Sequence, residues 1–137
     1  MSHTSLPPFA TPLTDRRIRH DDLLFPKVSI IVTNYNYSRF IVQTLRSVAR
    51  QSYHNWECIV VDDLSTDDSR KRIRRFIDDE EIHSEQFRVI ERKTNGGQLS
   101  AFMEGFRASA GEFVIMLDSD DILLDDFLHT HVEHHLG

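Results

Sequence analysis

Four short apolar segments alternate with amphipathic segments along most of this chain of 137 residues. Such segments are typical of strands that are buried on both faces of a sheet. After each of them, apolar residues recur at helical spacing. The strand–helix order, repeated four times, predicts an α/β fold with a mostly parallel sheet and helices on both faces. The predicted strands are residues 28–33, 56–61, 87–91 and 113–117.

Four helices are expected between and after these strands. The first spans about Arg39 to Arg50, and the last spans roughly Asp125 to Leu136. Ser65 or Thr66 can cap the second helix, because a hydroxyl before a helix accepts a hydrogen bond from its free N–H groups. The third helix carries apolar residues from Leu99 to Phe106 and is expected to end at the glycine Gly111.

Prolines and glycines divide the chain into two parts. All four prolines lie at or before Pro26, and all five glycines lie at or after Gly96. Residues 1–26 show no periodicity and mixed charge, so we predict an extended or partly disordered arm. Residues 27–137 form the predicted folded domain. The content of 39% hydrophobic and 28% charged residues is typical of a soluble globular domain.

Charge and cysteine content exclude several classes of protein. The formal net charge of −6 argues against a general nucleic-acid binder. The single Cys58 excludes an intrachain disulfide framework and a multi-cysteine zinc site. The sequence shows no secretory signal and no apolar run of membrane-spanning length. We therefore expect a cytoplasmic location.

Polar residues follow three of the predicted strands. They are residues 33–36, Asp62 with Asp63, and residues 118–121. In parallel α/β sheets, ligands bind at the carboxyl ends of the strands. These three loops are therefore the candidate site.

The loop after the fourth strand carries Asp118, Asp120 and Asp121. Three carboxylates so close together repel one another unless a cation or an array of donors neutralises them. Mg²⁺ and Mn²⁺ prefer oxygen ligands and keep substrate phosphates in their coordination shell. The D-x-D pattern could therefore hold a metal that bridges to a diphosphate. The alternative is that these acids are solvated or cap the next helix.

The other two loops also allow two interpretations. Asp62 and Asp63 could accept hydrogen bonds from a ribose or a base, or they could belong to a helix-capping turn. Tyr35 could stack on a nucleobase, because aromatic faces pair with flat rings, or it could be part of the core.

Several alternative motifs fail. The chain has neither G-x-G-x-x-G in its first strand–helix turn nor G-x-x-x-x-G-K-[ST]. An EF-hand starting at Asp118 would need a glycine and an acid where the chain has Leu123 and His129. The four histidines of the tail match no zinc-helix motif, so a polar helix face is favoured. The basic residues of 70–75 favour a solvated face, with an acidic partner or a membrane surface as the alternative.

Two longer segments carry a family resemblance. They read VSIIVTNYNYSRFIVQTLRSVARQSYHNWECIVVDDLSTDDS and NGGQLSAFMEGFRASAGEFVIMLDSDD. Together they resemble the start of a family 2 glycosyltransferase, from Lys27 to about Phe127. The resemblance implies the Rossmann-like GT-A fold, apparently truncated after the D-x-D motif. It also implies transfer of a sugar from a nucleotide-diphosphate sugar, most often a UDP-sugar, to an acceptor hydroxyl.

The resemblance also assigns roles at the strand ends. One acid contacts Mn²⁺ or Mg²⁺ directly, and the other residues surround the nucleotide. Asp120 resembles the metal ligand, and Asp118 resembles the acid near the ribose and the water shell of the metal. The remaining nucleotide-binding positions implied by the family are Thr33, Tyr35, Asp62, Asp63, Asn95 and Gly97.

The inverting mechanism of the family needs a general base, which the resemblance places beyond Gly137. The chain is therefore expected to carry the donor-binding half, while the acceptor, a glycan or a lipid-linked sugar, would bind elsewhere. Either the chain is a fragment of a longer enzyme, or it is a non-catalytic module that keeps only nucleotide binding or the fold. For the enzyme, the habits of the family imply a peripheral position at the inner face of the membrane as the alternative to a purely cytoplasmic one. An open sheet edge predicts a homodimer or poor solubility unless a C-terminal segment covers it.

Overall fold

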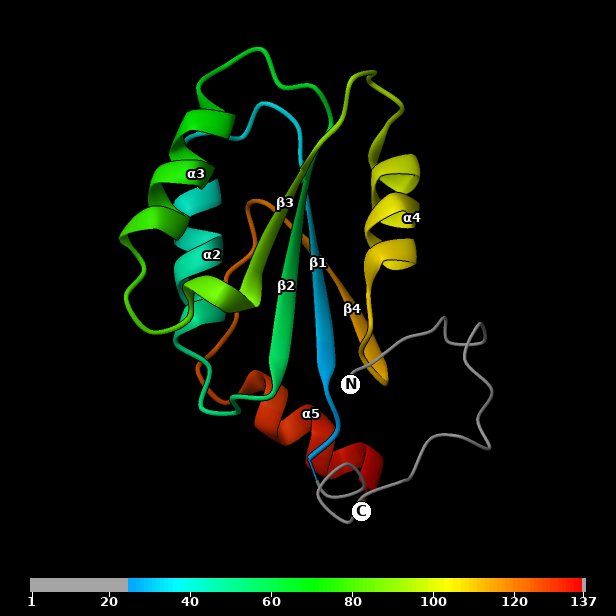
Figure 1. Ribbon diagram of the computed structural model, residues 1–137. Helices are drawn as coiled ribbons and strands as arrows, with labels where there is room; N and C mark the ends of the chain where they lie inside the picture. Colours follow the sequence, from blue (N-terminus) through cyan, green and yellow to red (C-terminus); the bar gives the residue numbers. More distant parts are fainter. Residues whose placement is uncertain (1–24, 137) are drawn as a thin grey trace.

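The computed structural model describes residues 25–136 and shows one four-stranded sheet in which every pairing is parallel (Figure 1). The strand order is β3-β2-β1-β4. All four predicted strands are confirmed, and three of them extend one residue further than predicted. The predicted arm, residues 1–26, lies almost entirely outside the described residues. The strands are β1 (Val28–Asn34), β2 (Trp56–Asp62), β3 (Phe87–Glu91) and β4 (Phe113–Asp118).

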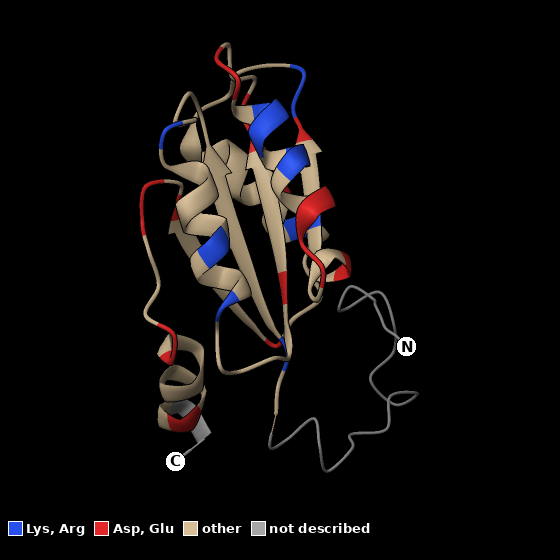
Figure 2. Ribbon diagram, turned by 90° about the vertical axis from the view of Figure 1, so that its left-hand side faces the viewer, with Lys and Arg blue, Asp and Glu red and all other residues tan. Residues whose placement is uncertain are grey.

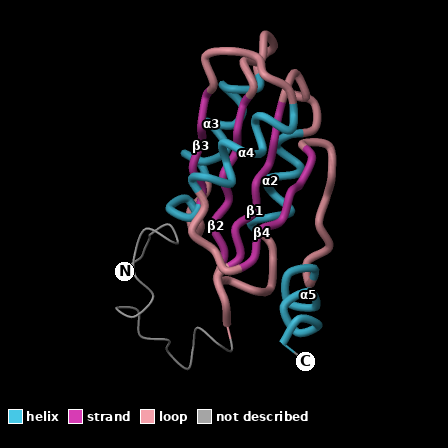
Figure 3. Tube along the Cα trace, turned by 90° about the vertical axis from the view of Figure 1, so that its right-hand side faces the viewer, coloured by secondary structure: helices cyan, strands magenta, loops and turns pink. Residues whose placement is uncertain are grey.

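The helices cover both faces of the sheet, as predicted. The chain moves outward from β1 through β2 to β3 and then returns across the sheet to β4. Because such crossovers are right-handed, the return places its helix on the opposite face. Helices α2 and α3 therefore share one face, and α4 covers the other (Figures 1 and 3). The helices are α2 (Ile41–Ala49), α3 (Ser69–Asp79), α4 (Gln98–Ala108) and α5 (Phe127–Leu136), with a short 3₁₀ turn, η2 (Ser84–Gln86), before β3.

Strand β1 is buried along its whole length. Its side chains alternate between two apolar clusters. Ile30 and Val32 pack in the larger cluster, beneath α2 and α3. Ile31 packs in the smaller cluster with Ala101 of α4. Burial on both faces explains why the sequence of β1 is almost continuously apolar.

The residues predicted to cap α3 and to end α4 do not have these roles. Helix α3 begins at Ser69, and neither Ser65 nor Thr66 caps it. Ser65 instead bonds to the carboxylate of Asp62 through both its backbone N–H and its hydroxyl. Helix α4 ends at Ala108, before Gly111.

Gly111 is needed for a different reason. It lies against β1, where a Cβ atom would stand 2.7 Å from the backbone nitrogen of Ser29.

Helix α5 starts later than predicted and lies beyond the amino ends of the strands (Figure 1). Its Leu128 and Val132 are buried in the larger apolar cluster. None of the helices in the part of the chain that the structure describes is both long and apolar enough to cross a membrane.

Asp62 ties the carboxyl end of β2 to its neighbours. Its side chain is fully buried, and it forms an ion pair with Arg70 of α3 at 2.7 Å. Asn34 of β1 and Ser65 also donate hydrogen bonds to it, at 2.9 and 2.6 Å. Burial alone would raise the pKa of Asp62, but the hydrogen bonds from Ser65, Arg70 and Asn34 together lower it below its ordinary value.

Gly105 of α4 lies so close to the sheet that a side chain has no room. A Cβ atom there would stand 2.6 Å from Cγ2 of Ile31 and 3.0 Å from Cγ2 of Val61. Alanine favours a helix interior over glycine by about 1 kcal/mol, whereas overpacking a core costs roughly 1–3 kcal/mol. We expect Gly105→Ala to lower the free energy of unfolding, measured by urea denaturation. The exposed Arg107→Ala in the same helix should change it by less than about 0.5 kcal/mol, and a stabilised Gly105→Ala would show that the contact relaxes freely.

Replacing Asp62 by Asn should destabilise the fold in a pH-dependent way. The ionised carboxylate stabilises the folded state above its unfolded pKa of about 3.9, and this contribution is lost as pH falls through the lower folded pKa. Losing one partner of a buried pair costs roughly 3–5 kcal/mol. We expect a loss near that size at pH 7 and a clearly smaller one at pH 3, measured by urea denaturation of both proteins. The exposed Asp78→Asn is the control, and an equal loss at both pH values would contradict the role of the charge.

Candidate functional site

A cleft lies at the carboxyl ends of β1 and β4. Strand β1 is the point at which the order of strands reverses, because β2 and β4 flank it on opposite sides. Connections leave such neighbouring strands in opposite directions, which opens a crevice between them. The volume of the cleft is about 620 Å³. Its walls come from the ends of β1 and β4 with the loops that follow them, from the residue after β2, and from the start of α4 with the loop before it. The lining residues are Thr33, Asn34, Tyr35, Asn36, Tyr37, Asp63, Asn95, Gly97, Gln98, Ala101, Asp118, Ser119 and Asp120.

Seven of the eight residues predicted for the site line this cleft. They come from four separate places in the sequence: Thr33, Tyr35, Asp63, Asn95, Gly97, Asp118 and Asp120. The exception is Asp62, which was predicted to bind nucleotide beside Asp63. Its carboxylate points into the protein and is used by Asn34, Ser65 and Arg70. The structure therefore gives Asp62 a role in holding the strand ends together.

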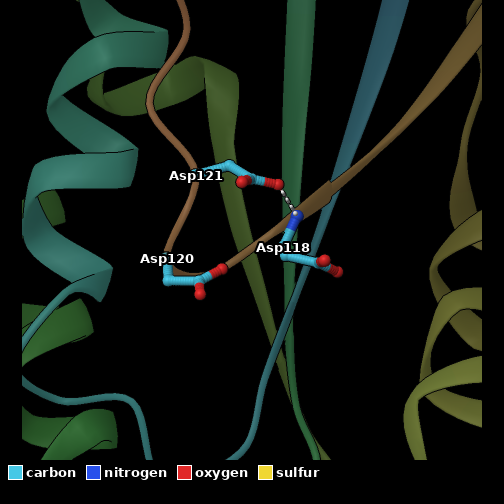
Figure 4. Close-up of side chains that lie close together, drawn as sticks. All are labelled: Asp118, Asp120 and Asp121. Atoms are coloured by element: carbon cyan, nitrogen blue, oxygen red, sulfur yellow. Dashed lines mark hydrogen bonds between the residues drawn. The ribbon is translucent and has the colours of Figure 1, made fainter.

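The aspartates after β4 form a tight turn, which we call the acid turn (residues 118–121). The backbone N–H of Asp121 donates to the carbonyl of Asp118 at 3.0 Å, and a carboxylate oxygen of Asp121 accepts from the N–H of Asp118 at 3.3 Å. The side chains of Asp118, Asp120 and Asp121 are exposed, and one oxygen of each lies within 4.8 Å of the others (Figure 4). Gln98 of α4 donates to Asp118. None of the described Lys or Arg residues forms an ion pair with these three carboxylates.

This donor set fits a hard divalent cation. Carboxylate oxygens are the ligands that Mg²⁺ and Mn²⁺ prefer, and both ions use few protein ligands when a phosphate supplies the rest. The three oxygens are close enough to share one ion. Asp118 and Asp120 also line the cleft, so a metal held by them would face a ligand bound in the cleft.

Asp63 holds the glycine loop (residues 95–97) at the start of α4. The carboxylate of Asp63 accepts hydrogen bonds from the N–H groups of Gly96 and Gly97, at 3.1 and 2.8 Å. Arg92 pairs with the same carboxylate at 2.8 Å and also bonds to Glu104. Gly97 has a φ of 93°, which favours glycine. Asp63 thus lines the cleft while its oxygens fix the adjoining glycine loop, which also lines it.

Tyr35 and Tyr37 stand on an anchored loop. Both are about half exposed, at 45% and 46%. Between them, Asn36 has a φ of 59°, and its side-chain oxygen accepts hydrogen bonds from the N–H groups of Thr66 and Asp67. A fixed backbone with two exposed rings offers a flat surface on which a planar ligand can stack.

Asp67 anchors the same loop from the other side. It accepts a hydrogen bond from the N–H of Ser38 at 3.1 Å and another from the N–H of Ser69 at 2.9 Å. Burial would raise the pKa of Asp67, but the hydrogen bonds from Ser69 and Ser38 lower it below its ordinary value. The lowered pKa shows that the folded loop favours the ionised carboxylate, which is the form that accepts both hydrogen bonds.

Three lining residues lie outside the predicted site. Tyr37 adjoins the predicted loop of residues 33–36, so extending that loop by one residue would have found it. Gln98 and Ala101 are on the first turn of α4, and nothing in the local sequence links them to the strand ends. Asn34, Asn36 and Ser119 also line the cleft and belong to the predicted loops, although the sequence assigns them no individual role.

Comparison with known proteins identifies the family. The sequence model for Glycosyl transferase family 2 matches residues 29–136. An uncharacterized glycosyltransferase from Nostoc sp. is 40% identical over 96 residues, which cover 70% of this chain and 29% of the relative. The chain spans less than half of the length of the curated relatives that it matches.

Solved structures show the same fold. TarS 1–349 from S. aureus in complex with UDP-GlcNAc gives a TM-score of 0.70 at 31% identity, covering 80% of this chain and 32% of that structure. The mannosyltransferase PcManGT from Pyrobaculum calidifontis, in complex with GDP-Man and Mn²⁺, gives 0.66 at 28% identity, covering 71% and 28%. The Rossmann-like GT-A fold predicted from the sequence is confirmed. Because the family model matches nearly all of the described residues, this chain belongs to glycosyltransferase family 2.

Proposed function

We propose that the cleft binds the nucleotide-diphosphate part of a sugar donor, and that residues 27–137 are the donor-binding portion of a metal-assisted, inverting glycosyltransferase. The observation that carries this proposal is the meeting of the acid turn, the two tyrosines and the glycine loop around one cleft. The tyrosines offer a ring on which a planar base can stack, and a metal held by the acid turn would supply the positive charge that a diphosphate needs. The glycine loop, whose Gly96 and Gly97 N–H groups donate to Asp63, forms the adjoining wall.

The proposed arrangement places the base near Thr33 and Tyr35. The diphosphate then lies toward β4, where Asp118 and Asp120 hold Mn²⁺ or Mg²⁺. Asn95 and Gly97 border the nucleotide from the α4 side. A bound metal would supply positive charge that offsets the negative charge developing on the departing diphosphate.

Two structural neighbours support a nucleotide-sugar donor, because one was solved with UDP-GlcNAc and the other with GDP-Man and Mn²⁺. The nucleotides bound to these two neighbours have different bases, uracil and guanine, and stacking on Tyr35 would favour neither base. We propose a UDP-sugar as the first candidate. The general base and the site for a glycan or lipid-linked acceptor are proposed to lie outside residues 27–137.

Thermal unfolding with UDP, GDP and dTDP, each with and without Mn²⁺, tests the proposal. A ligand at a hundredfold its dissociation constant stabilises the fold by roughly 2.7 kcal/mol. We expect one nucleotide to raise the midpoint of unfolding only when Mn²⁺ is present, because a metal held by the acid turn would supply the positive charge that the diphosphate needs. Asp120→Asn should abolish the shift.

The matched control is Asp78→Asn, an exposed aspartate on α3 that does not line the cleft. It removes the same charge and should leave the shift intact. A wild-type midpoint that no nucleotide moves, with or without metal, would contradict the proposed donor site.

A further inference from the structure

Helix α2 and the chain just beyond its end carry a buried polar stripe, which we define as Thr44, Ser47 and Gln51. Thr44 and Ser47 share one side of the helix at spacing i, i+3, and Gln51 follows the helix by two residues. Each is at most 1% exposed. Buried polar side chains are costly unless they are hydrogen-bonded. Their partners therefore show what the stripe does.

The stripe binds the segment that follows β4. Ser47 accepts a hydrogen bond from the N–H of Leu123 at 3.0 Å. The side-chain amide of Gln51 donates to the carbonyl of Leu124 at 2.6 Å and accepts from the N–H of Leu128 at 3.0 Å. Residues 119–126 lie in neither strand nor helix, so α2 supplies the partners that a sheet or helix would give (Figure 3). In Figure 2 this segment runs from the red acid turn down to α5.

Thr44 is the member of the stripe that reaches the acid turn. Its hydroxyl lies 2.8 Å from the carbonyl oxygen of Ser119 and 2.6 Å from that of Asp121. These two carbonyls belong to the residues on either side of Asp120. Because a peptide unit is planar, holding both carbonyls restricts the backbone of Asp120 and the direction of its side chain.

Thr44 does not line the cleft, and it is fully buried. It therefore cannot contact a bound nucleotide or metal directly. The bond across the acid turn, from the N–H of Asp121 to the carbonyl of Asp118, closes the turn without attaching it to the rest of the protein. Gln98 of α4 attaches the side chain of Asp118 from one face of the sheet, and the hydroxyl of Thr44 attaches the backbone of the turn from the other.

We infer that Thr44 is a positioning residue for the metal-binding carboxylates of the acid turn. This inference rests on the proposed function, since it assumes that Asp118 and Asp120 hold the metal. The hydroxyl carries one proton, which the carbonyls of Ser119 and Asp121 share. Removing it leaves both carbonyls without this donor, so the turn can shift and the carboxylates no longer converge. Groups that orient metal ligands typically change metal affinity by roughly 10–100-fold when they are removed.

The test compares three replacements of Thr44. Valine keeps the shape and alanine avoids crowding, but both lack the hydroxyl; serine keeps it. Mn²⁺ affinity is measured by electron paramagnetic resonance titration with saturating UDP and, separately, with saturating GDP. We expect Thr44→Val and Thr44→Ala to weaken Mn²⁺ binding by about tenfold or more, and Thr44→Ser to restore it to near the wild-type value.

The control is Ser29→Ala, which removes another fully buried hydroxyl. Ser29 lies near the amino end of β1, where it donates to Glu57 at 2.5 Å, at the opposite end of the strand from the cleft. Amide hydrogen exchange of residues 118–124 gives a readout that does not depend on metal. It should become faster in Thr44→Val and Thr44→Ala and stay unchanged in Ser29→Ala.

The outcomes separate the two proposals. If the wild-type chain binds Mn²⁺ and the hydroxyl-free variants bind it equally well, the positioning role is wrong while the proposed donor site stands. Equal weakening by Thr44→Ser or by Ser29→Ala would also overturn it, because the loss would then follow from packing or general stability. If the wild-type chain binds no Mn²⁺ with either nucleotide, the proposed metal site fails and the inference fails with it.

Discussion

The parallel pairing of β1 with a neighbour on each side is the constraint on which the rest of the structure depends. In register, Thr33 of β1 lies beside Val61 of β2 and Asp118 of β4, so three strand ends meet at one edge of the sheet. Polar residues placed after those strands necessarily gather there. Helix α4 completes the wall, because the return from β3 to β4 must cross the face opposite α2 and α3.

Charge is distributed unevenly among the aspartates at this edge. Asp62 and Asp63 are buried, and each is neutralised by an arginine, Arg70 or Arg92. Their carboxylates hold the strand ends and the glycine loop in place. The three carboxylates of the acid turn are exposed, and among the described residues they accept hydrogen bonds from the side-chain amide of Gln98 and from the backbone N–H of Asp118. Negative charge that the protein has not neutralised is therefore concentrated at the end of β4, where a cation is best accommodated.

The strands and the face of each helix could be predicted because their periodicity reflects burial. The helix boundaries were less accurate, since Ser65 was assigned to a cap when its hydroxyl is used by Asp62. Asp62 and Ser65 are only three residues apart, but the burial that makes Asp62 need this hydroxyl is decided by tertiary packing. For the same reason, Asp62 was grouped with Asp63 as nucleotide-binding, although only Asp63 lines the cleft.

The sequence by itself determined the parallel α/β order, the family and most of the cleft, because apolar periodicity and strand-end polar residues are local patterns. The tertiary structure alone decided which aspartates are neutralised and which remain open, because Arg70 and Arg92 reach them from later elements of the chain. It also decided that Thr44, Ser47 and Gln51 support the segment after β4. These side chains lie more than seventy residues from their partners in the sequence, and only the packing of α2 beside the end of β4 brings them together.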